Sequence, residues 1–149
     1  MMLSLTYVSQ ATAVFDDARL TALLHAAQKR NEARNITGAL AHSNGWFVQV
    51  LEGESEEVSR LYGVIAKDPR HINPTIILKQ TVAARAFADW SMAMIKCKQS
   101  ANDTLRNVHQ ITRKAKESEN FSSVDAVQAF IAPPRLAIQG DYQAVFLRQ

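Results

Sequence analysis

The segment Ile36–Gly53 reads ITGALAHSNGWFVQVLEG and places a glutamine in a run that is otherwise typical of a hydrophobic strand. The turn residues Ser43–Gly45 separate two apolar stretches, a pattern that predicts a β-hairpin. Residues on both faces of the second strand are apolar, so we expect this strand to be covered on both sides. Gln49 then carries a buried amide, which costs about 1–3 kcal/mol if it is left unpaired. We therefore expect a polar group to meet it.

The elements around this hairpin follow from strand alternation, helical spacing and capping residues. In chain order they are a strand at Leu3–Ser9, a helix from Asp16 or Asp17 to about Arg34, a helix that follows Ser55 and ends at Asp68-Pro69, and strands at Thr75–Val82 and Trp90–Lys96. The order β-α-β-β-α-β-β predicts a ferredoxin-like α+β sheet with two helices on one face.

The remaining residues predict a C-terminal helical extension. One helix begins near Asn102 with Leu105 on its apolar stripe, a second follows Ser122 or Ser123, and Leu136–Gln149 shows no clear period. We divide the chain into a domain at 1–97 and an extension at 98–149 that packs on the second face of the sheet. This packing would explain the two apolar faces of the hairpin strand.

Composition limits the class of protein. The chain has 149 residues with 47% hydrophobic and 21% charged residues, which is typical of a globular domain. We see no signal peptide and no apolar run of about 18 residues. The single cysteine, Cys97, fits a reducing compartment, so a cytoplasmic protein is expected.

Patterns for other chemistries are missing from the sequence. The net charge of +3 is mild, and the basic residues between Arg106 and Lys116 are interpreted as a solvated helix face. We therefore expect no nucleic-acid or membrane partner. The four histidines are dispersed, so no metal site is predicted, and no phosphate-binding or nucleophile motif occurs.

Three polar side chains point inward from elements that pack together, namely Tyr7, Asn31 and Gln49. Each also has a plain structural interpretation, because a buried tyrosine usually bonds a nearby carbonyl and an asparagine near a helix end is often a cap. Their convergence favours a planar ligand with polar edges and apolar faces. The apolar walls would come from Leu23 or Leu24 and from Ile65.

These residues resemble the BLUF family of blue-light photoreceptor domains over about Leu3–Lys96. The resemblance rests on Tyr7, Asn31, the run Asn35–Gly38, the run Phe47–Gly53, Asp68-Pro69-Arg70-His71, and Arg85, Phe87, Trp90 and Met92 with their spacing. It implies a flavin held non-covalently between the two helices of a ferredoxin-like domain. FAD is the expected cofactor, with FMN and riboflavin as alternatives, and no net chemistry on a substrate is implied.

The resemblance also implies roles for individual residues. Tyr7 would hydrogen-bond Gln49, Gln49 would contact the flavin ring, and Asn31 would fix the carbonyl edge of the ring. Light would drive a transient transfer from Tyr7, after which Gln49 rotates or tautomerises and the absorption shifts slightly to the red. The expected cofactor-binding set is Tyr7, Leu23, Leu24, Lys29, Arg30, Asn31, Phe47, Gln49, Ile65, Arg70 and His71.

Two features are less well defined. Some relatives carry a basic residue just before Ile65 that meets the flavin phosphates, but here that residue is Val64. Lys29, Arg30, Lys67 and Arg70 are unranked substitutes, and His71 can equally be a structural or surface histidine. Trp90 and Met92 would relay the light signal into the last strand, although plain core filling is the alternative for both.

The resulting hypothesis is a short photoreceptor without a catalytic output domain. We expect it to signal to an unidentified downstream protein through the strand at Trp90–Lys96 and the helices beyond Asn102, and to form homo-oligomers. Two alternatives remain, an RNA-binding ferredoxin-like module and a flavin-dependent enzyme. The first would require exposed aromatic and basic residues on an open sheet face.

Overall fold

The structure is a computed structural model that describes residues 1–13, 16–89, 91–97, 99–132 and 142–147. Its elements in chain order are β1 (Met2–Ala11), α1 (Asp17–Ala33), β2 (Thr37–Ser43), β3 (Trp46–Glu54), α2 (Ser55–Ala66), β4 (His71–Thr81), β5 (Met92–Cys97), α3 (Ala101–Glu117), α4 (Ser123–Ile131) and β6 (Tyr142–Leu147).

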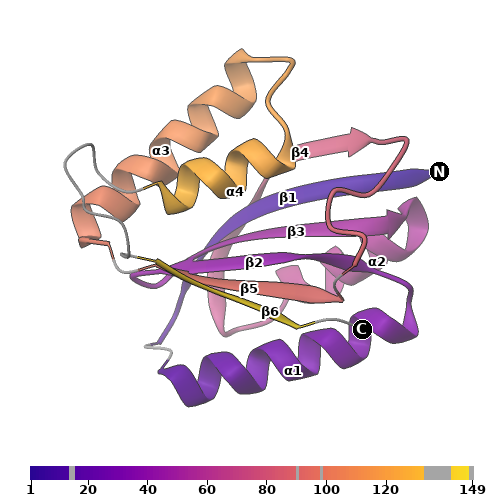
Figure 1. Ribbon diagram of the computed structural model, residues 1–149, viewed down its shortest axis with the longest axis horizontal. Coiled ribbons are helices and arrows are strands. Elements are labelled where there is room, and N and C mark those ends of the chain that lie inside the picture. The colour runs from indigo at the N-terminus through magenta and orange to yellow at the C-terminus, as the bar shows by residue number, and fades with distance from the viewer. Residues whose placement is uncertain (14–15, 90, 98, 133–141, 148–149) are drawn as a thin grey trace.

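A single mixed sheet forms the centre of the molecule, with the strand order β4-β1-β3-β2-β5-β6. The β2–β5 pair is parallel, and the other neighbouring pairs are antiparallel. Helices α1 and α2 lie on one face of the sheet, and α3 and α4 lie on the other (Figure 1). The predicted ferredoxin-like α+β fold with helices on both faces is therefore confirmed.

The central hairpin is formed by β2 and β3 as the turn residues predict. Ser43 pairs with Trp46, which leaves Asn44 and Gly45 as a two-residue loop, and both have positive φ angles of 47° and 79°. Positive φ at both positions is typical of a type I′ turn, which matches the natural twist of two paired strands. This turn fixes the register that places Leu40 opposite Gln49.

Strand β3 is buried on both faces, as predicted, because a hydrophobic core lies on each side of it. On one side Leu51 packs with residues of α1 and α2, and on the other Val48 and Val50 pack with α3 and α4. Close packing also explains Gly38 in β2, since a Cβ atom there would overlap the carbonyl oxygen of Val50. Gln49 thus lies in an apolar layer.

The strand boundaries after α2 differ from the sequence-based expectation. Strand β4 begins at His71 rather than Thr75 and includes Pro74. It lies at the edge of the sheet, where a proline is tolerated because its nitrogen need not donate to a neighbouring strand. Strand β5 begins at Met92 rather than Trp90, and Trp90 lies outside the described residues.

The extension contains the two predicted helices. Ser122 forms a capping box with Asp125 at the start of α4. The predicted buried stripe of α3 is wrong at Leu105, which is 40% exposed, whereas Thr104 and Asn107 are buried. The helix is rotated because these two polar side chains hydrogen-bond the hairpin turn and the end of α4.

The segment Leu136–Gln149, which shows no clear period in the sequence, contains strand β6. Strand β6 pairs antiparallel with β5, with Met94 opposite Val145. The extension is therefore not purely helical, and β6 occupies the edge of β5 that would otherwise be unpaired. The tail residues Leu136 and Ile138 lie outside the described residues. Among the described helices, none has the length and apolar character needed to cross a bilayer.

Candidate functional site

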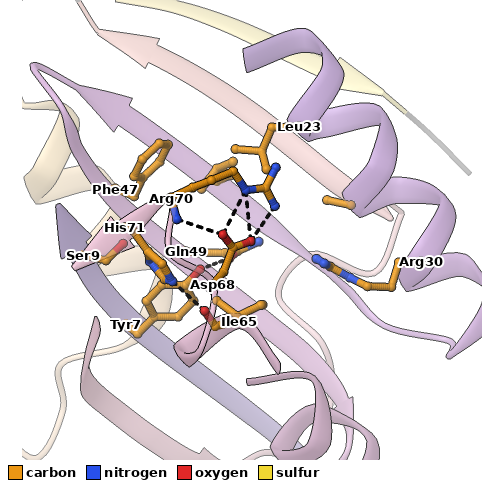
Figure 2. A pocket seen from close by; sticks show the side chains of 12 residues that line it. Tyr7, Ser9, Leu23, Arg30, Phe47, Gln49, Ile65, Asp68, Arg70 and His71 are labelled. Carbon is orange, nitrogen blue, oxygen red and sulfur yellow. Dashed lines mark hydrogen bonds and ion pairs between the residues drawn. The ribbon is translucent and has the colours of Figure 1, made fainter. Parts of the chain in front are cut away.

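A cavity opens between α1, the end of α2 and the face of the sheet that these helices cover (Figure 2). The space between these elements amounts to about 520 Å³, a figure that includes open solvent at the mouth. Its lining residues are Tyr7, Ser9, Leu23, Ala27, Arg30, Leu40, Phe47, Gln49, Ile65, Asp68, Arg70 and His71.

Tyr7 and Gln49 form a buried hydrogen bond at this cavity. They are opposite each other in the β1–β3 pairing, and the Tyr7 hydroxyl donates to Gln49 Oε1. Both side chains are only 4% exposed. Burial raises the pKa of Tyr7, although the positive charge of Arg30 acts in the opposite direction. Tyr7 is therefore a neutral phenol at physiological pH, with its proton directed at an amide oxygen.

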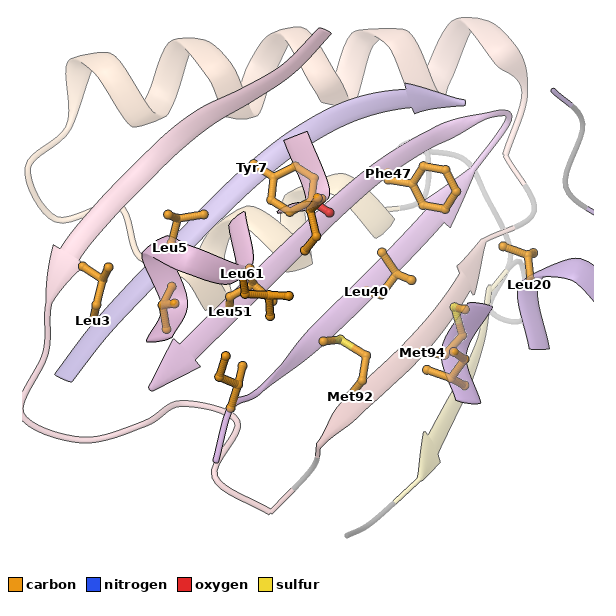
Figure 3. Close-up of a cluster of buried hydrophobic side chains, with 14 residues drawn as sticks. Leu3, Leu5, Tyr7, Leu20, Leu40, Phe47, Leu51, Leu61, Met92 and Met94 are labelled. Atoms are coloured by element: carbon orange, nitrogen blue, oxygen red, sulfur yellow. The ribbon is translucent and has the colours of Figure 1, made fainter. Parts of the chain in front are cut away.

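The other end of the Gln49 amide faces β5. Gln49 Nε2 lies 3.6 Å from the sulfur of Met92, which is completely buried. Figure 3 shows Tyr7 on β1 and Met92 on β5 within one hydrophobic cluster, with Leu40 of β2 between them. The amide thus connects Tyr7 and Met92 across the sheet. Because its two ends differ in hydrogen-bonding character, a rotation of Gln49 would change both contacts together.

Aromatic side chains surround Tyr7. The ring of Tyr62 meets it edge-on, with centroids 5.3 Å apart, and the ring of His71 lies 6.2 Å away. His71 Nε2 donates to the carbonyl oxygen of Ile65 at 2.6 Å, which fixes the imidazole at the end of α2. His71 therefore has a structural partner and also lines the cavity.

Asn31 lies near the C-terminal end of α1 and is completely buried. Its Nδ2 donates to the carbonyl oxygen of Ser91 at 2.8 Å, so its side chain is not a helix cap. Gln28, on the same helix, donates to the carbonyl oxygen of Met92 at 3.3 Å. These two amides attach α1 to the beginning of β5.

Three buried polar atoms at or beside the cavity have no hydrogen-bond partner within the described chain. They are Ser9 Oγ, Arg30 Nε and Asn31 Oδ1. Buried polar atoms are nearly always paired, so such a group of unpaired atoms requires an explanation. A planar heterocycle with carbonyl and N–H groups along one edge would pair with Arg30 Nε and Asn31 Oδ1, which belong to adjacent residues of α1, while Leu23, Leu40 and Phe47 would contact its apolar surface.

The mouth of the cavity carries an ion pair. Arg70 and Asp68 interact through Nη2 and Oδ2 at 2.6 Å, and Arg70 Nε contacts both carboxylate oxygens at 3.0 Å. The hydrogen bond from Arg70 holds the pKa of Asp68 below its usual range. The pair lies in the connection between α2 and β4, on the solvent side of the cavity.

The structure brings most of the predicted cofactor-binding side chains together. The lining includes Tyr7, Leu23, Arg30, Phe47, Gln49, Ile65, Arg70 and His71. Two predicted residues, Leu24 and Lys29, are not among the described lining residues of the cavity. Leu24 is buried in the core, and Lys29 is exposed. Asn31 lies behind the lining, next to Arg30.

Sequence reasoning missed four lining residues. Ser9 follows Tyr7 by two residues on the same strand face, and Ala27 lies four residues from both Leu23 and Asn31 on the helix. Strand and helix periods could have found both of them. Leu40 follows from the hairpin register, whereas the position of Asp68 depends on the path of a loop. The structure forms no cluster of metal-binding side chains among the residues it describes.

Comparison with known proteins identifies a family. Residues 2–93 match the family described as BLUF, sensors of blue-light using FAD. The photoactivated adenylate cyclase subunit beta of Euglena gracilis is 40% identical over 90 residues, which make up 60% of this chain and 10% of that protein. The chain therefore spans about a tenth of the length of this curated relative.

Solved structures show the same fold. A structure described as the BlsA photo-activated state has a TM-score of 0.64 at 26% identity, with 94% of this chain and 99% of that chain covered. A structure of Klebsiella pneumoniae BlrP1 with FMN and cyclic diGMP has a TM-score of 0.67 at 30% identity, with 89% and 35% covered. The similarity to BlsA extends beyond the matched family region into the extension.

Proposed function

The chain belongs to the BLUF family of blue-light sensors that use a flavin, and from this premise we propose that it signals to a protein partner through a light-driven rearrangement of the Tyr7–Gln49 hydrogen bond. The observation that carries the proposal is this buried hydrogen bond at the inner wall of the cavity. No step of the proposal requires a substrate or a catalytic output domain.

FAD or FMN is the cofactor of this family, and the residues of the cavity fit such a ring. Leu23 and Ile65 would contact its two faces from α1 and α2. Arg30 Nε would donate to a carbonyl oxygen of the ring, and Asn31 Oδ1 would accept from a ring N–H, because each is a buried polar atom without a partner in the described chain. Gln49 would reach the ring from the sheet.

The chemistry requires an electron donor next to the ring. A bound flavin absorbs blue light and is a strong one-electron oxidant while excited. With a flavin bound, Tyr7 would give an electron to the excited ring and pass its phenolic proton towards Gln49 Oε1, and both would return to Tyr7 within the same cycle. There would be no net oxidation, but Gln49 would keep a rotated or tautomerised amide. Its changed hydrogen bond to the ring would shift the absorption to the red.

The signal would leave through β5. Met92 contacts Gln49 directly, and its carbonyl oxygen accepts a hydrogen bond from Gln28 of α1. A rearranged amide would therefore alter how Met92 packs, and β5 would transmit this change to β6 and to the helices on the second face. We propose Trp90 as a second relay residue. A partner, or a second copy of the chain, must bind the two states with different affinities for a signal to result.

The two alternative functions have less support. An RNA-binding module of this fold would present an open sheet face, but α3 and α4 cover that face here. A flavin enzyme would need a substrate position beside the ring, and the unpaired buried atoms Arg30 Nε and Asn31 Oδ1 are those that the ring itself would pair.

Spectroscopy of two variants tests the switch. The purified chain should show oxidised-flavin absorption that shifts to the red by a few nanometres under blue light and recovers in darkness. Gln49→Ala should keep the flavin and lose the shift, because no amide remains to rearrange. Tyr7→Phe should also lose it, because a phenyl ring has no phenolic proton.

Asn31→Ala serves as the comparison variant. We expect it to weaken flavin binding while the bound fraction still shifts. A normal red shift in Gln49→Ala would contradict the assigned switch. A chain that is colourless and takes up no added flavin would contradict the proposed function as a whole.

A further inference from the structure

The connection between β4 and β5, residues 82–91, crosses one end of the sheet. In the strand order β4-β1-β3-β2-β5-β6 it passes β1, β3 and β2 before β5 begins at Met92 (Figure 1). The four strand spacings amount to about 19 Å, whereas a segment of this length can extend to roughly 33 Å. The length of the connection therefore does not fix its path, and side-chain contacts must do so.

Arg85 and Glu52 bind each other's backbone in the middle of this connection. Glu52 is only 1% exposed, and its Oε1 and Oε2 accept from the backbone N–H groups of Phe87 and Ala86 at 2.8 and 3.2 Å. In return, Arg85 Nη1 donates to the backbone carbonyl oxygen of Glu52 at 3.2 Å. Hydrogen bonds to a carboxylate are stronger than those between neutral groups, so this reciprocal arrangement, the Arg85–Glu52 lock, holds the connection to β3.

Arg85 also attaches the connection to α1 and β2. Its Nη2 donates to the carbonyl oxygen of Asn35 at 2.7 Å, and its Nη1 donates to Thr37 Oγ1 at 2.9 Å. Asn35 follows the C-terminal end of α1, where helix carbonyl groups carry partial negative charge and stabilise a cation. One planar guanidinium thus joins three elements, which suits its fixed fork of N–H donors better than a lysine ammonium.

The same end of α1 holds the last residue of the connection. Asn31 Nδ2 donates to the carbonyl oxygen of Ser91 at 2.8 Å, and Ser91 is completely buried. The connection is therefore attached to this end of α1 twice, first through Arg85 and then through Ser91.

Strand β5 begins directly after the second attachment. Its first residue, Met92, has its sulfur 3.6 Å from Gln49 Nε2. Only residues 88–91 separate Met92 from Phe87, whose N–H group is held by the lock. A displacement of the locked segment would therefore reach the contact between Met92 and Gln49.

We propose that Arg85 and Glu52 are positioning residues for the switch, because their lock sets the point at which β5 begins and so holds Met92 against Gln49. The inference rests on the proposed function, which gives this contact its role. The described lining of the cavity includes neither Arg85 nor Glu52, so they act on the switch only through Ser91 and Met92. A lock that served stability alone would leave Met92 in place when it is broken.

Methionine methyl NMR on the full chain separates these two roles. The chain contains four methionines, namely Met1, Met2, Met92 and Met94, so isotope labelling of their methyl groups gives few signals, and Met92→Leu assigns one of them. Glu52→Gln should move the Met92 signal in darkness, because a neutral amide offers one acceptor oxygen to two N–H groups. The signal of Met94, which is also buried in β5, should stay unchanged.

Two further variants complete the design. Glu54→Gln is the matched control, since Glu54 is an exposed acid on the same strand that pairs with the amino terminus, and it should leave the Met92 signal unchanged. Arg85→Lys breaks the other half of the lock while it keeps the charge, and it should move the Met92 signal as Glu52→Gln does. It also carries the test if Glu52→Gln does not fold.

Hydrogen exchange reports on the lock itself. The amide of Phe87 should exchange about 10-fold or more faster in Glu52→Gln, as expected when a hydrogen bond to a carboxylate is weakened. Faster exchange together with an unmoved Met92 signal would assign the lock to stability alone and would overturn the positioning role. Equal movement of the Met92 and Met94 signals would also overturn it, because the whole strand would then have loosened.

Illumination separates this inference from the proposed function. Glu52→Gln should keep the red shift of the bound flavin, because the Tyr7–Gln49 pair is unchanged, and should lose most of the light-induced movement of the Met92 signal. A light-induced movement as large as that of the unmodified chain would overturn the positioning role. Absence of any red shift in the unmodified chain would instead count against the proposed function, and the Met92 signal in darkness would still decide the role of the lock.

Discussion

Tyr7 and Gln49 define what the cavity can do at the scale of single residues. Both were identified in the sequence because a polar side chain interrupts an apolar face, and the strand period indicates the face on which each one lies. Their direct hydrogen bond follows from the β1–β3 register, which a strand pattern alone does not give. The contacts of Asp68 and Arg70 could not be predicted, because they depend on how the loop between α2 and β4 folds back over the cavity.

The buried state of Tyr7 gives a test that does not depend on light. Burial raises the pKa of Tyr7 above its ordinary value of about 10. The contribution of this shift to the stability of the folded protein is therefore complete below pH 10 and is lost as the pH rises further. We expect the native protein and Tyr7→Phe to form the same amount of tyrosinate up to about pH 11. Ultraviolet difference absorbance measures this quantity.

Denaturant supplies the control for this titration. In the unfolded chain Tyr7→Phe should lose one of three tyrosine contributions, because all three are then exposed. A smaller native tyrosinate signal near pH 10 in Tyr7→Phe would mean that Tyr7 ionises in the folded state and is not buried as described.

At the scale of elements, the β2–β3 turn is attached to the C-terminal extension. Asn44 Nδ2 donates to the carbonyl oxygen of Gln99 at 2.7 Å, and the hydroxyls of Ser43 and Thr104 are 2.8 Å apart. The turn was predicted from Asn44 and Gly45, but its polar contacts were not. They involve residues about sixty positions apart, so a local pattern does not reveal them. The contact with Ser43 explains why α3 buries Thr104, and its rotation leaves Leu105 exposed.

Asn107 provides a measure of how firmly the two helices of the extension are joined. Its Nδ2 donates to the carbonyl oxygens of Phe130 and Ala132 at 3.0 and 3.2 Å, at the end of α4. Asn107→Ala should lower the free energy of unfolding by about 1–3 kcal/mol, because buried carbonyl groups lose a donor. Chemical denaturation monitored by circular dichroism measures the change.

Asn102→Ala is the matched variant on the same helix, at an exposed position. It should change stability by less than about 0.5 kcal/mol. Equal effects of the two substitutions would show that Asn107 does not hold α4. Gln99 donates to the same two carbonyl groups, so a double variant should lose more than Asn107→Ala alone.

At the scale of the whole molecule, the sensing face and the second face are connected by the sheet between them. The near-continuous apolar run Trp46–Leu51 was sufficient to predict this arrangement, because a strand that is apolar on both faces must be covered twice. Strand β6 was not predicted, since its pairing with β5 depends on an edge created by the rest of the fold. Two routes from Gln49 to the extension follow: one through Met92 and β5, and one along β3 to the turn at Asn44.

Hydrogen exchange in darkness and under blue light distinguishes these routes. If Met92 carries the signal, the amide protection of β5 should change together with that of the extension, within residues 90–149, while the turn at Asn44 stays the same. Such a change can be small in structure and still alter the affinity for a partner, because affinity depends on the population of each state. Gln49→Ala under the same illumination is the control and should show no difference.

If protection is identical in both states while the red shift is intact, neither route carries the signal. A change confined to Asn44 and its contacts on α3 would assign the signal to the β2–β3 hairpin, because the hairpin joins Gln49 to that turn without passing through Met92.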